Sequence, residues 1–174
     1  AEEATAEAGI TLAQLNDPLA DHGLKYAPDP AWGDKSVLGG CIGNNTTGAH
    51  SLKYGKADYY LEQAEVVLAD GTVTTLGEVT LDELEENGDP DGDLEERFYA
   101  EVKKILDEDA EEIKEKYPAL KRNVSGYNFD MLVDEAEGQR KLPDHSGVDP
   151  DSEPGTVNLA RLMAGSEGTL GVVT

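Results

Sequence analysis

The chain has 174 residues, and its 37 Asp and Glu against 14 Lys and Arg give a formal net charge of −23. Nucleic acids and anionic membrane surfaces are bound by clusters of Lys and Arg, so this charge balance excludes both as the main partner. The length predicts one domain of about 100–200 residues, and the single cysteine, Cys41, excludes a disulfide framework and a cysteine-based zinc or iron–sulfur site within these residues.

The acidic residues are spread over the whole chain, from Glu2 to Glu167, and alternate with apolar residues. This distribution is typical of the solvated faces of a folded chain, whereas a disordered acidic tail would concentrate the charge. In about 1 M salt the Debye length falls to about 3 Å, which screens the repulsion between so many carboxylates. We therefore interpret the sequence as that of a halophilic, cytoplasmic protein. No apolar run reaches the ~18 residues of a membrane span, and residues 1–9 lack a signal-peptide pattern.

The first third of the chain predicts a short strand, a helix and a glycine-rich segment. Residues 4–10 are expected to be the strand, and Thr11 the N-cap of a helix that ends near Gly23. The segment Pro28-Asp29-Pro30 excludes a helix, because proline lacks a backbone N–H and restricts the residue before it. Residues 37–55 carry five glycines and very little charge, which is unusual in so acidic a sequence.

Residues 62–69 and 72–76 form the most strongly predicted hairpin. Both segments contain Val or Thr at several positions, as antiparallel strands do. The Asp70-Gly71 pair between them is expected to supply the positive φ angles of a tight turn.

A long amphipathic helix is predicted after the hairpin. Asp93 lies at its N-cap and Glu96 at the capping-box position, and Pro118 ends it. The apolar stripe of this helix is expected to consist of Phe98, Val102, Ile105 and Ile113.

The last part of the chain predicts short helices over residues 129–136 and 158–164, with a surface loop rich in Pro and Gly over 138–155 between them. Residues 165–174 are expected to end as a strand. Strands separated by helices of unequal length predict an α+β fold, in which helices flank an antiparallel or mixed sheet.

Two glycine-rich segments, 39–48 and 165–171, have little charge and are the most informative features. Glycines let backbone N–H groups approach a ligand closely, and neighbouring amides and hydroxyls can bind its polar edge. The alternative is that both segments are tight turns between packed elements. Because two such segments occur in a chain of net charge −23, we favour an anionic or polar ligand.

The sequence gives little support to a metal site or an activated nucleophile. Residues 89–93 resemble the start of a calcium loop, but Leu94 stands where that loop needs Gly and Ala100 where it needs Glu. His145 has no second His or Cys nearby, and no Gly-x-Ser-x-Gly motif occurs. His50 lies inside the glycine-rich segment 37–55 and is the one histidine interpreted as a candidate for lining a site.

Several motifs occur in the same order as in the FAD-linked oxidase family. They are Gly39-Gly-Cys-Ile-Gly-Asn-Asn-Thr-Thr-Gly48, Gly165-Ser-Glu-Gly-Thr-Leu-Gly-Val-Val-Thr174 and the segments 9–16, 28–30, 50–55 and 66–71. The ordered set resembles the FAD-binding domain of the PCMH or vanillyl-alcohol oxidase type. Two further motifs resemble more narrowly its D-lactate, glycolate and D-2-hydroxyglutarate dehydrogenase branch, namely Asn123-Val-Ser-Gly-Tyr-Asn128 and Asn158-Leu-Ala-Arg-Leu162.

The resemblance implies that FAD is the cofactor and that this chain supplies neither a catalytic residue nor a metal ligand. The segment 28–35 would lie along the cofactor, 39–48 would approach its pyrophosphate and flavin, and 167–173 would hold its adenosine end. The residues expected to bind FAD are Pro28, Asp29, Gly39, Gly40, Asn44, Asn45, Thr46, Thr47, Gly48, Ser51, Tyr54, Glu167, Gly168, Thr169, Gly171, Val172 and Val173.

The resemblance also implies that residues 1–174 are part of a larger flavin enzyme. They resemble the second lobe of its FAD-binding domain, with an acidic helical insertion over about 77–157. The family's Gly-Gly-Gly-Thr-Ser pyrophosphate loop would precede them and its substrate-binding cap would follow, and an iron–sulfur module can lie elsewhere in the protein. The implied reaction is oxidation of a small 2-hydroxy acid with hydride transfer to the flavin. We expect residues 1–174 by themselves to bind FAD weakly or not at all and to be inactive.

Two other functions stay open on the sequence. One is a folded, salt-adapted module without catalytic function, which would leave FAD unbound. The other is a flavin oxidase branch that acts on sugars or aryl alcohols, which the motif over residues 123–128 disfavours.

The charge predicts how stability depends on salt. Because like charges repel and salt screens them, we expect the melting temperature to rise as KCl is raised from millimolar to molar concentration. Thermal unfolding followed by circular dichroism measures this rise. A melting temperature that stays constant over that range would contradict the halophilic interpretation.

Overall fold

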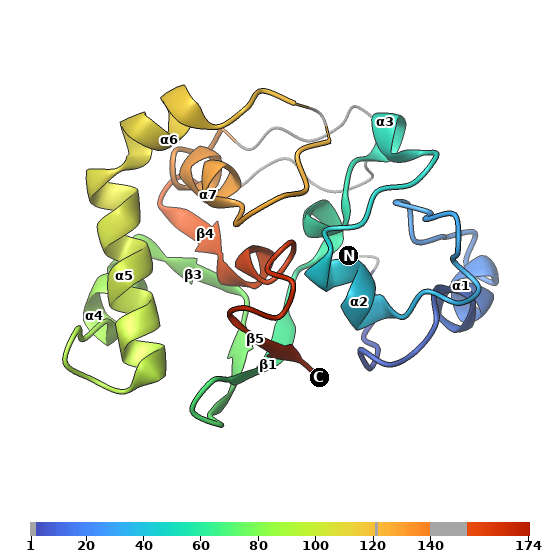
Figure 1. The fold of residues 1–174 in the computed structure, drawn as a ribbon, viewed down its shortest axis with the longest axis horizontal. Helices are drawn as coiled ribbons and strands as arrows, with labels where there is room; N and C mark the ends of the chain where they lie inside the picture. The colour runs from blue at the N-terminus through green and yellow to red at the C-terminus, as the bar shows by residue number, and fades with distance from the viewer. Residues whose placement is uncertain (1–2, 121, 140–152) are drawn as a thin grey trace.

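Figure 1 shows the computed structural model of the chain, which describes residues 3–120, 122–139 and 153–174. The described residues form two small antiparallel sheets with helices around them, which confirms the α+β prediction. The helices are α1 (Leu12–Ala20), α2 (Leu38–Gly43), α3 (Ser51–Tyr54), α4 (Leu81–Asn87), α5 (Leu94–Glu108), α6 (Ala110–Lys116) and α7 (Phe129–Ala136), with two 3-10 helices, η1 (Ala57–Tyr60) and η2 (Leu159–Leu162). The strands are β1 (Ala64–Leu68), β2 (Val73–Leu76), β3 (Glu78–Thr80), β4 (Thr156–Asn158) and β5 (Gly171–Val173). His145 and most of the loop predicted over 138–155 lie outside the described residues.

The larger sheet has the strand order β2-β1-β5, and both outer strands run antiparallel to β1. Every second residue of β1 is buried, as expected for a sheet with one face on the core. On the other face, Val67 of β1 pairs with Val73 of β2 and with Val172 of β5. The smaller sheet joins β3 to β4 and lies next to helix α7.

The hairpin between β1 and β2 has a three-residue loop and not a two-residue turn. The Leu68 N–H donates to Thr72 O at 2.8 Å, and the Gly71 N–H donates to Leu68 O at 3.0 Å. Only Gly71 has a positive φ, of 91°, while the Asp70 carboxylate accepts a hydrogen bond from the Thr72 N–H at 2.9 Å. The two strands are therefore confirmed, whereas the prediction that the Asp-Gly pair supplies the positive φ angles holds for the glycine alone.

The long helix predicted after Asp93 is in fact two helices. Its beginning is confirmed, because Asp93 accepts the Glu96 N–H at 3.0 Å and Glu96 accepts the Asp93 N–H at 2.7 Å. Asp109 leaves the helical conformation with φ −112° and ψ 1°, so α5 ends there and α6 begins. Val102 of α5 and Ile113 of α6 are both buried in the same core, which is why the apolar pattern continues across the break.

Two other segments differ from the sequence prediction. Residues 4–10 are not a strand, because their backbone pairs with the start of α2: the Leu38 N–H donates to Ile10 O at 2.9 Å. The helix predicted over 158–164 is a strand end followed by the 3-10 helix η2. The helix over 129–136 and the strand near the C-terminus are confirmed.

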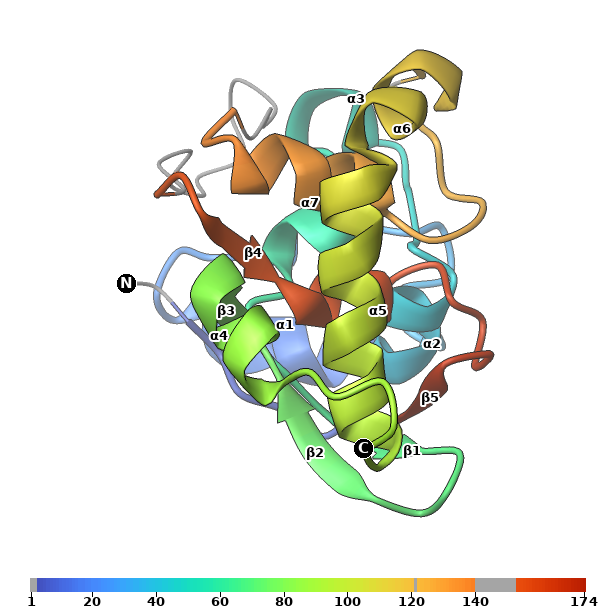
Figure 2. The ribbon, with the colours of Figure 1, turned by 90° about the vertical axis from the view of Figure 1, so that its left-hand side faces the viewer.

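The apolar core lies between the two sheets and helices α4 to α7. Figure 2 shows these elements from the side of α5. Its most deeply buried side chains include Val66, Leu132 and Leu159. A second, smaller cluster of Leu12, Leu15 and Cys41 holds α1 against α2. None of the helices in the described parts of the chain is long and apolar enough to cross a membrane.

A substitution at Gly71 tests the conformation of the loop between β1 and β2. Changing Gly71 to Ala is expected to lower the free energy of unfolding by about 1–2 kcal/mol, because an L-residue is strained at positive φ. Urea denaturation measures the loss. The matched control is Gly77→Ala, since Gly77 has no positive φ and an added Cβ there would be 3.6 Å from its nearest neighbours. Equal effects of the two substitutions would contradict the loop conformation.

Candidate functional site

The fold brings the two glycine-rich segments side by side. Helix α2 occupies most of the first segment, and the second follows η2 and leads into β5 (Figure 1). The Gly165 N–H donates to Ile42 O at 3.0 Å, and the Glu167 N–H donates to Gly43 O at 3.0 Å. These backbone bonds join segments that are more than 120 residues apart in sequence, and sequence reasoning alone did not predict the contact.

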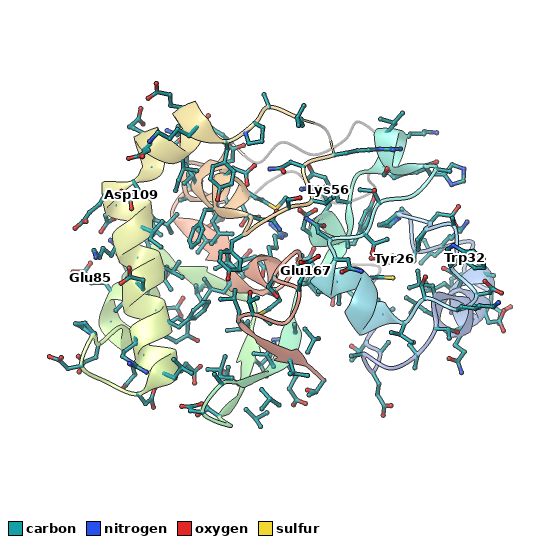
Figure 3. All side chains as sticks on the ribbon, viewed as in Figure 1. Tyr26, Trp32, Lys56, Glu85, Asp109 and Glu167 are labelled. Atoms are coloured by element: carbon teal, nitrogen blue, oxygen red, sulfur yellow. The ribbon has the colours of Figure 1, made fainter. Side chains whose placement is uncertain are left out.

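A shallow groove of about 390 Å³ lies where the two segments meet, near the lower end of the range of ~300–1,000 Å³ for small-molecule sites. It is lined by Ala8, Gly9, Gly39, Gly40, Gly43, Met163, Ser166, Gly168, Gly171, Val172 and Val173. None of these lining residues is charged, and five of them are glycines from the two segments. Glu167, the one acidic residue of the two segments, has φ +50° and an exposed side chain beside the groove (Figure 3).

The glycines of the groove are required for different reasons. A Cβ on Gly39 would lie 2.8 Å from the Ala8 Cβ, so packing against residue 8 alone explains this glycine. The Gly39 N–H also already donates to Ala8 O at 2.8 Å. A Cβ on Gly43 would meet no atom within 4 Å, and it would stand in open space on the groove. Packing within the protein therefore does not explain why residue 43 is a glycine, and the space beside it is open to a ligand.

A second group of the predicted residues forms a neighbouring cluster around Gly48. A Cβ on Gly48 would lie 2.0 Å from Asp29 O and 2.2 Å from Pro28 O, so only glycine allows this close backbone contact. The Ser51 hydroxyl donates to Gly48 O at 2.8 Å, and Tyr54 follows in α3. Pro28, Gly48 and Ser51 are therefore packed together in one cluster.

Asp29 is the acidic residue of this cluster, and the Arg122 guanidinium donates to Gly48 O at 3.2 Å. Asp29 has φ +46°, and its carboxylate lies 2.7 Å from the Lys25 ammonium and 2.8 Å from Nδ1 of His50. The hydrogen bond from Lys25, and that from His50 to a smaller extent, hold the pKa of Asp29 below its ordinary value of 3.8. His50 therefore contacts a carboxylate and the ring of Tyr54, at a centroid distance of 6.4 Å.

Asn45 has a place that the sequence did not reveal. Its side chain is completely buried, and both ends of its amide are bonded to Asp58. Asn44 beside it is exposed, and Thr46 and Thr47 are half-buried. Of the two neighbouring asparagines, only Asn44 presents its side chain to solvent.

The residues predicted near the C-terminus lie on the other side of the groove. Thr169 Oγ1 donates to Ser166 O at 2.6 Å and lies 2.9 Å from the Tyr127 hydroxyl. Gly168 has φ +80°, and Val172 is 63% exposed. Ala8, Gly9, Gly43, Met163 and Ser166 also line the groove and were missed. Gly43 and Ser166 lie within the two glycine-rich segments, which were the available signal, whereas the side chains of Ala8 and Met163 carry no sequence signal for binding.

The motifs at 123–128 and 158–162 have structural contacts. Asn128 Nδ2 donates to Arg161 O at 3.0 Å and to Ala164 O at 2.8 Å. Asn158 Nδ2 donates to Glu62 O at 2.9 Å, and the Arg161 guanidinium is paired with buried Glu135. These motifs therefore anchor the segment that precedes the groove. The described residues contain no group of three His, Cys, Asp or Glu side chains placed to hold a metal ion.

Comparisons with known proteins agree with the sequence motifs. Residues 1–77 match the family model described as FAD binding domain. The chain is similar to the D-2-hydroxyglutarate dehydrogenases of Haemophilus influenzae, at 29% identity over 174 residues, and of Pseudomonas putida, at 31% over 170 residues; each match covers 96% of this chain and 15% of the relative. The D-lactate dehydrogenase of Archaeoglobus fulgidus is 40% identical over 74 residues, which are 42% of this chain and 16% of that protein. The chain thus spans about 15% of the length of the curated relatives it matches, and the matches confirm the resemblance to this dehydrogenase branch.

The Asp29 contacts predict a pH dependence of stability. Because the folded-state pKa of Asp29 is lowered, its stabilising contribution is present above pH ~4 and is lost as the pH falls through the folded-state value. We expect Asp29→Asn, which tolerates the positive φ, to lower the melting temperature near pH 6 and to have little effect near pH 2. Melting curves of the two proteins over pH 2–7 measure this difference. A deficit of the variant that is independent of pH would contradict the ion-pair explanation.

Proposed function

Because residues 1–77 match the family model described as FAD binding domain, we propose that the groove between α2 and residues 165–173 holds part of an FAD molecule. The observation that carries this proposal is the chemistry of the groove. In a chain of net charge −23, none of the residues that line it is charged. The diphosphate of FAD is anionic, so a site that binds it must keep carboxylates away.

The residues of the groove fit such a ligand in shape as well as in charge. Gly43 and Gly168 leave room for a close approach of the ligand, since a Cβ at either position would meet no protein atom within 4 Å. Ser166, whose hydroxyl donates to Met163 O at 2.9 Å, contributes polar surface, while Val172 and Val173 contribute apolar surface. An uncharged surface with open space at its glycines and an apolar wall suits a dinucleotide with flat rings.

The full reaction is proposed by analogy with the matched relatives, whose printed names are D-2-hydroxyglutarate and D-lactate dehydrogenase. In this proposal the protein that contains residues 1–174 oxidises a small 2-hydroxy acid, and bound FAD accepts the hydride. The part played by this chain is to bind and orient the cofactor and to exclude carboxylates from its phosphates. The residues that bind the substrate, and any iron–sulfur module, would lie outside these 174 residues.

The domain assignment belongs to the same proposal. Residues 1–76 and 158–174 would form the second lobe of the FAD-binding domain, because β1, β2, β5 and the groove all come from them. Residues 77–157 would be an insertion, since α4 packs against α5, α5 against α6 and α6 against α7. In Figure 1 these helices lie on the left of the molecule, whereas α1 and α2 lie on the right. Figure 2 shows α4, α5 and α6 from that side. We assign these helices a structural role.

Direct binding tests the proposed site. FAD titrated into the protein in molar KCl is expected to slow the hydrogen exchange of backbone amides in residues 39–48 and 165–171, while the amides of α5 stay unchanged. Mass spectrometry of peptides from these segments measures the change. An unaltered exchange pattern at millimolar FAD would overturn the proposal and favour a module without cofactor.

A single methyl group tests the placement of the ligand in the groove. Gly43→Ala is expected to raise the dissociation constant for FAD about tenfold, because overpacking by one methyl typically costs about 1–3 kcal/mol. The fold should be unaffected, since Ala suits the end of a helix and meets no neighbour. Gly77→Ala, outside the groove, is the matched control. Equal FAD affinity of both variants would place the ligand elsewhere.

A further inference from the structure

A buried carboxylate lies behind the groove. Asp58 of η1 is completely inaccessible to solvent, and its Oδ2 accepts hydrogen bonds from Asn45 Nδ2 at 2.7 Å and from Lys56 Nζ at 2.8 Å. The Asp58 N–H donates to Asn45 Oδ1 at 3.1 Å, so the two residues are bonded in both directions. Lys56 is itself only 6% exposed, and Figure 3 places it near the centre of the molecule.

Burial of this ion pair costs free energy, and the pair contributes something else at this position. Burying an ion pair gains little stability over an apolar pair of the same size, because both charges lose their hydration. What the pair does provide is defined geometry, since each bond has a fixed direction. Lys56 Nζ also donates to Asn123 O at 2.7 Å, and through this bond it ties the motif at 123–128 to η1.

Asn45 lies in the left-handed backbone region, which asparagine adopts more readily than most other residues. Its φ is +45°, a region where residues other than glycine are uncommon. At this point the chain leaves α2: the Asn45 N–H donates to Ile42 O at 2.8 Å and the Thr46 N–H donates to Cys41 O at 2.8 Å. The two-way bond with Asp58 therefore fixes how the first glycine-rich segment continues beyond α2.

The same network reaches the second segment. Asn45 Nδ2 lies 3.4 Å from Asn128 Oδ1, and Asn128 Nδ2 donates to Ala164 O at 2.8 Å, immediately before Gly165. The chain of contacts thus runs from Asp58 to both sides of the groove. A Cβ on Gly165 would lie 2.9 Å from Gly126 O and 3.5 Å from the Asn45 Cβ, so the parts pack without spare room.

We propose that Asp58 is a positioning residue for the FAD groove, which holds the end of α2 and the start of the 165–171 segment at the spacing that the cofactor needs. The inference rests on the proposed function, because the groove is assigned to FAD there. Asp58 acts indirectly, because its hydrogen bonds to Asn45 and its ion pair with Lys56 involve no residue that lines the groove. Its role is carried through Asn45, which lies at the end of α2 and whose amide also contacts Asn128.

Because only one carboxylate oxygen of Asp58, Oδ2, accepts hydrogen bonds from side chains in the described parts of the chain, two substitutions can separate loss of the charge from loss of the hydrogen bonds. Asp58 Oδ1 and the Tyr26 hydroxyl are both buried without a hydrogen-bond partner among the described residues. Burial, and to a smaller extent the charges of Cys41 and Asp58, raise the pKa of Tyr26, which stays a neutral hydroxyl. In Asp58→Asn the amide oxygen can take the place of Oδ2 and keep the Asn45 bond, while the NH2 group takes the unpartnered side. Asp58→Ala removes every side-chain bond.

The experiment compares FAD affinity and local hydrogen exchange in these variants. Asp58→Ala is expected to raise the dissociation constant for FAD about tenfold and to speed exchange of the amides of residues 44–48, because it removes the charge-assisted hydrogen bond from Asn45 Nδ2 that orders this segment and leaves the Lys56 ammonium buried without its partner. Asp58→Asn keeps an acceptor for Asn45 Nδ2 but leaves the buried Lys56 ammonium beside a neutral amide, so it should recover part of the affinity. Glu85→Ala, on the exposed surface of α4, is the control for loss of one carboxylate and should leave both measurements unchanged.

A second variant keeps the test decisive if Asp58→Ala does not fold. Asn45→Gly accepts the positive φ without strain and removes the tether from its other end. It too is expected to weaken FAD binding about tenfold, with the exchange of β1 amides unchanged. Wild-type FAD affinity in the folded variants would overturn the inference. If the wild-type protein itself shows no response to FAD, the proposed function fails instead, and the exchange of residues 44–48 alone decides whether Asp58 positions this segment.

Discussion

The buried contact between Asp58 and Asn45 is the constraint on which the arrangement of the candidate site depends. It joins η1 to the end of α2, and the further contact of Asn45 with Asn128 extends it to the segment before Gly165. A buried carboxylate left without these donors would be strongly destabilising, so the two segments cannot separate without a large cost. The apolar core alone would not define their spacing so closely, because apolar contacts have no preferred direction.

The electrostatic organisation of the chain follows the same division. Carboxylates cover the solvated helices, such as the exposed Glu85 and Asp109 in Figure 3, while the groove is lined by glycines and neutral side chains. Two of the acids near the site, Asp29 and Asp58, are each paired with a lysine, whereas Glu167 beside the groove has its side chain exposed to solvent. Negative charge close to the groove is therefore compensated locally.

Sequence patterns identified the elements whose signals are local. The capping box of Asp93 and Glu96, the helix over 129–136 and the two strands of the hairpin depend on neighbours a few residues away, and all were confirmed. The break at Asp109 was missed, since the apolar stripe continues through it. Helix α2 was missed as well, because Gly39 and Gly40 have a low helix propensity that tertiary contacts override.

The sequence by itself determined that the chain is an acidic α+β domain with two glycine-rich segments of the FAD-binding type, because composition, capping and motif order are properties of the linear chain. Only the tertiary structure decided which predicted residues meet. It placed Gly39, Gly168 and Val172 on one groove, Pro28 against Gly48, and the side chain of Asn45 in the interior. The physical reason is that these contacts join residues far apart in the chain, and a buried hydrogen bond such as that between Asn45 and Asp58 leaves no periodic signal in the sequence.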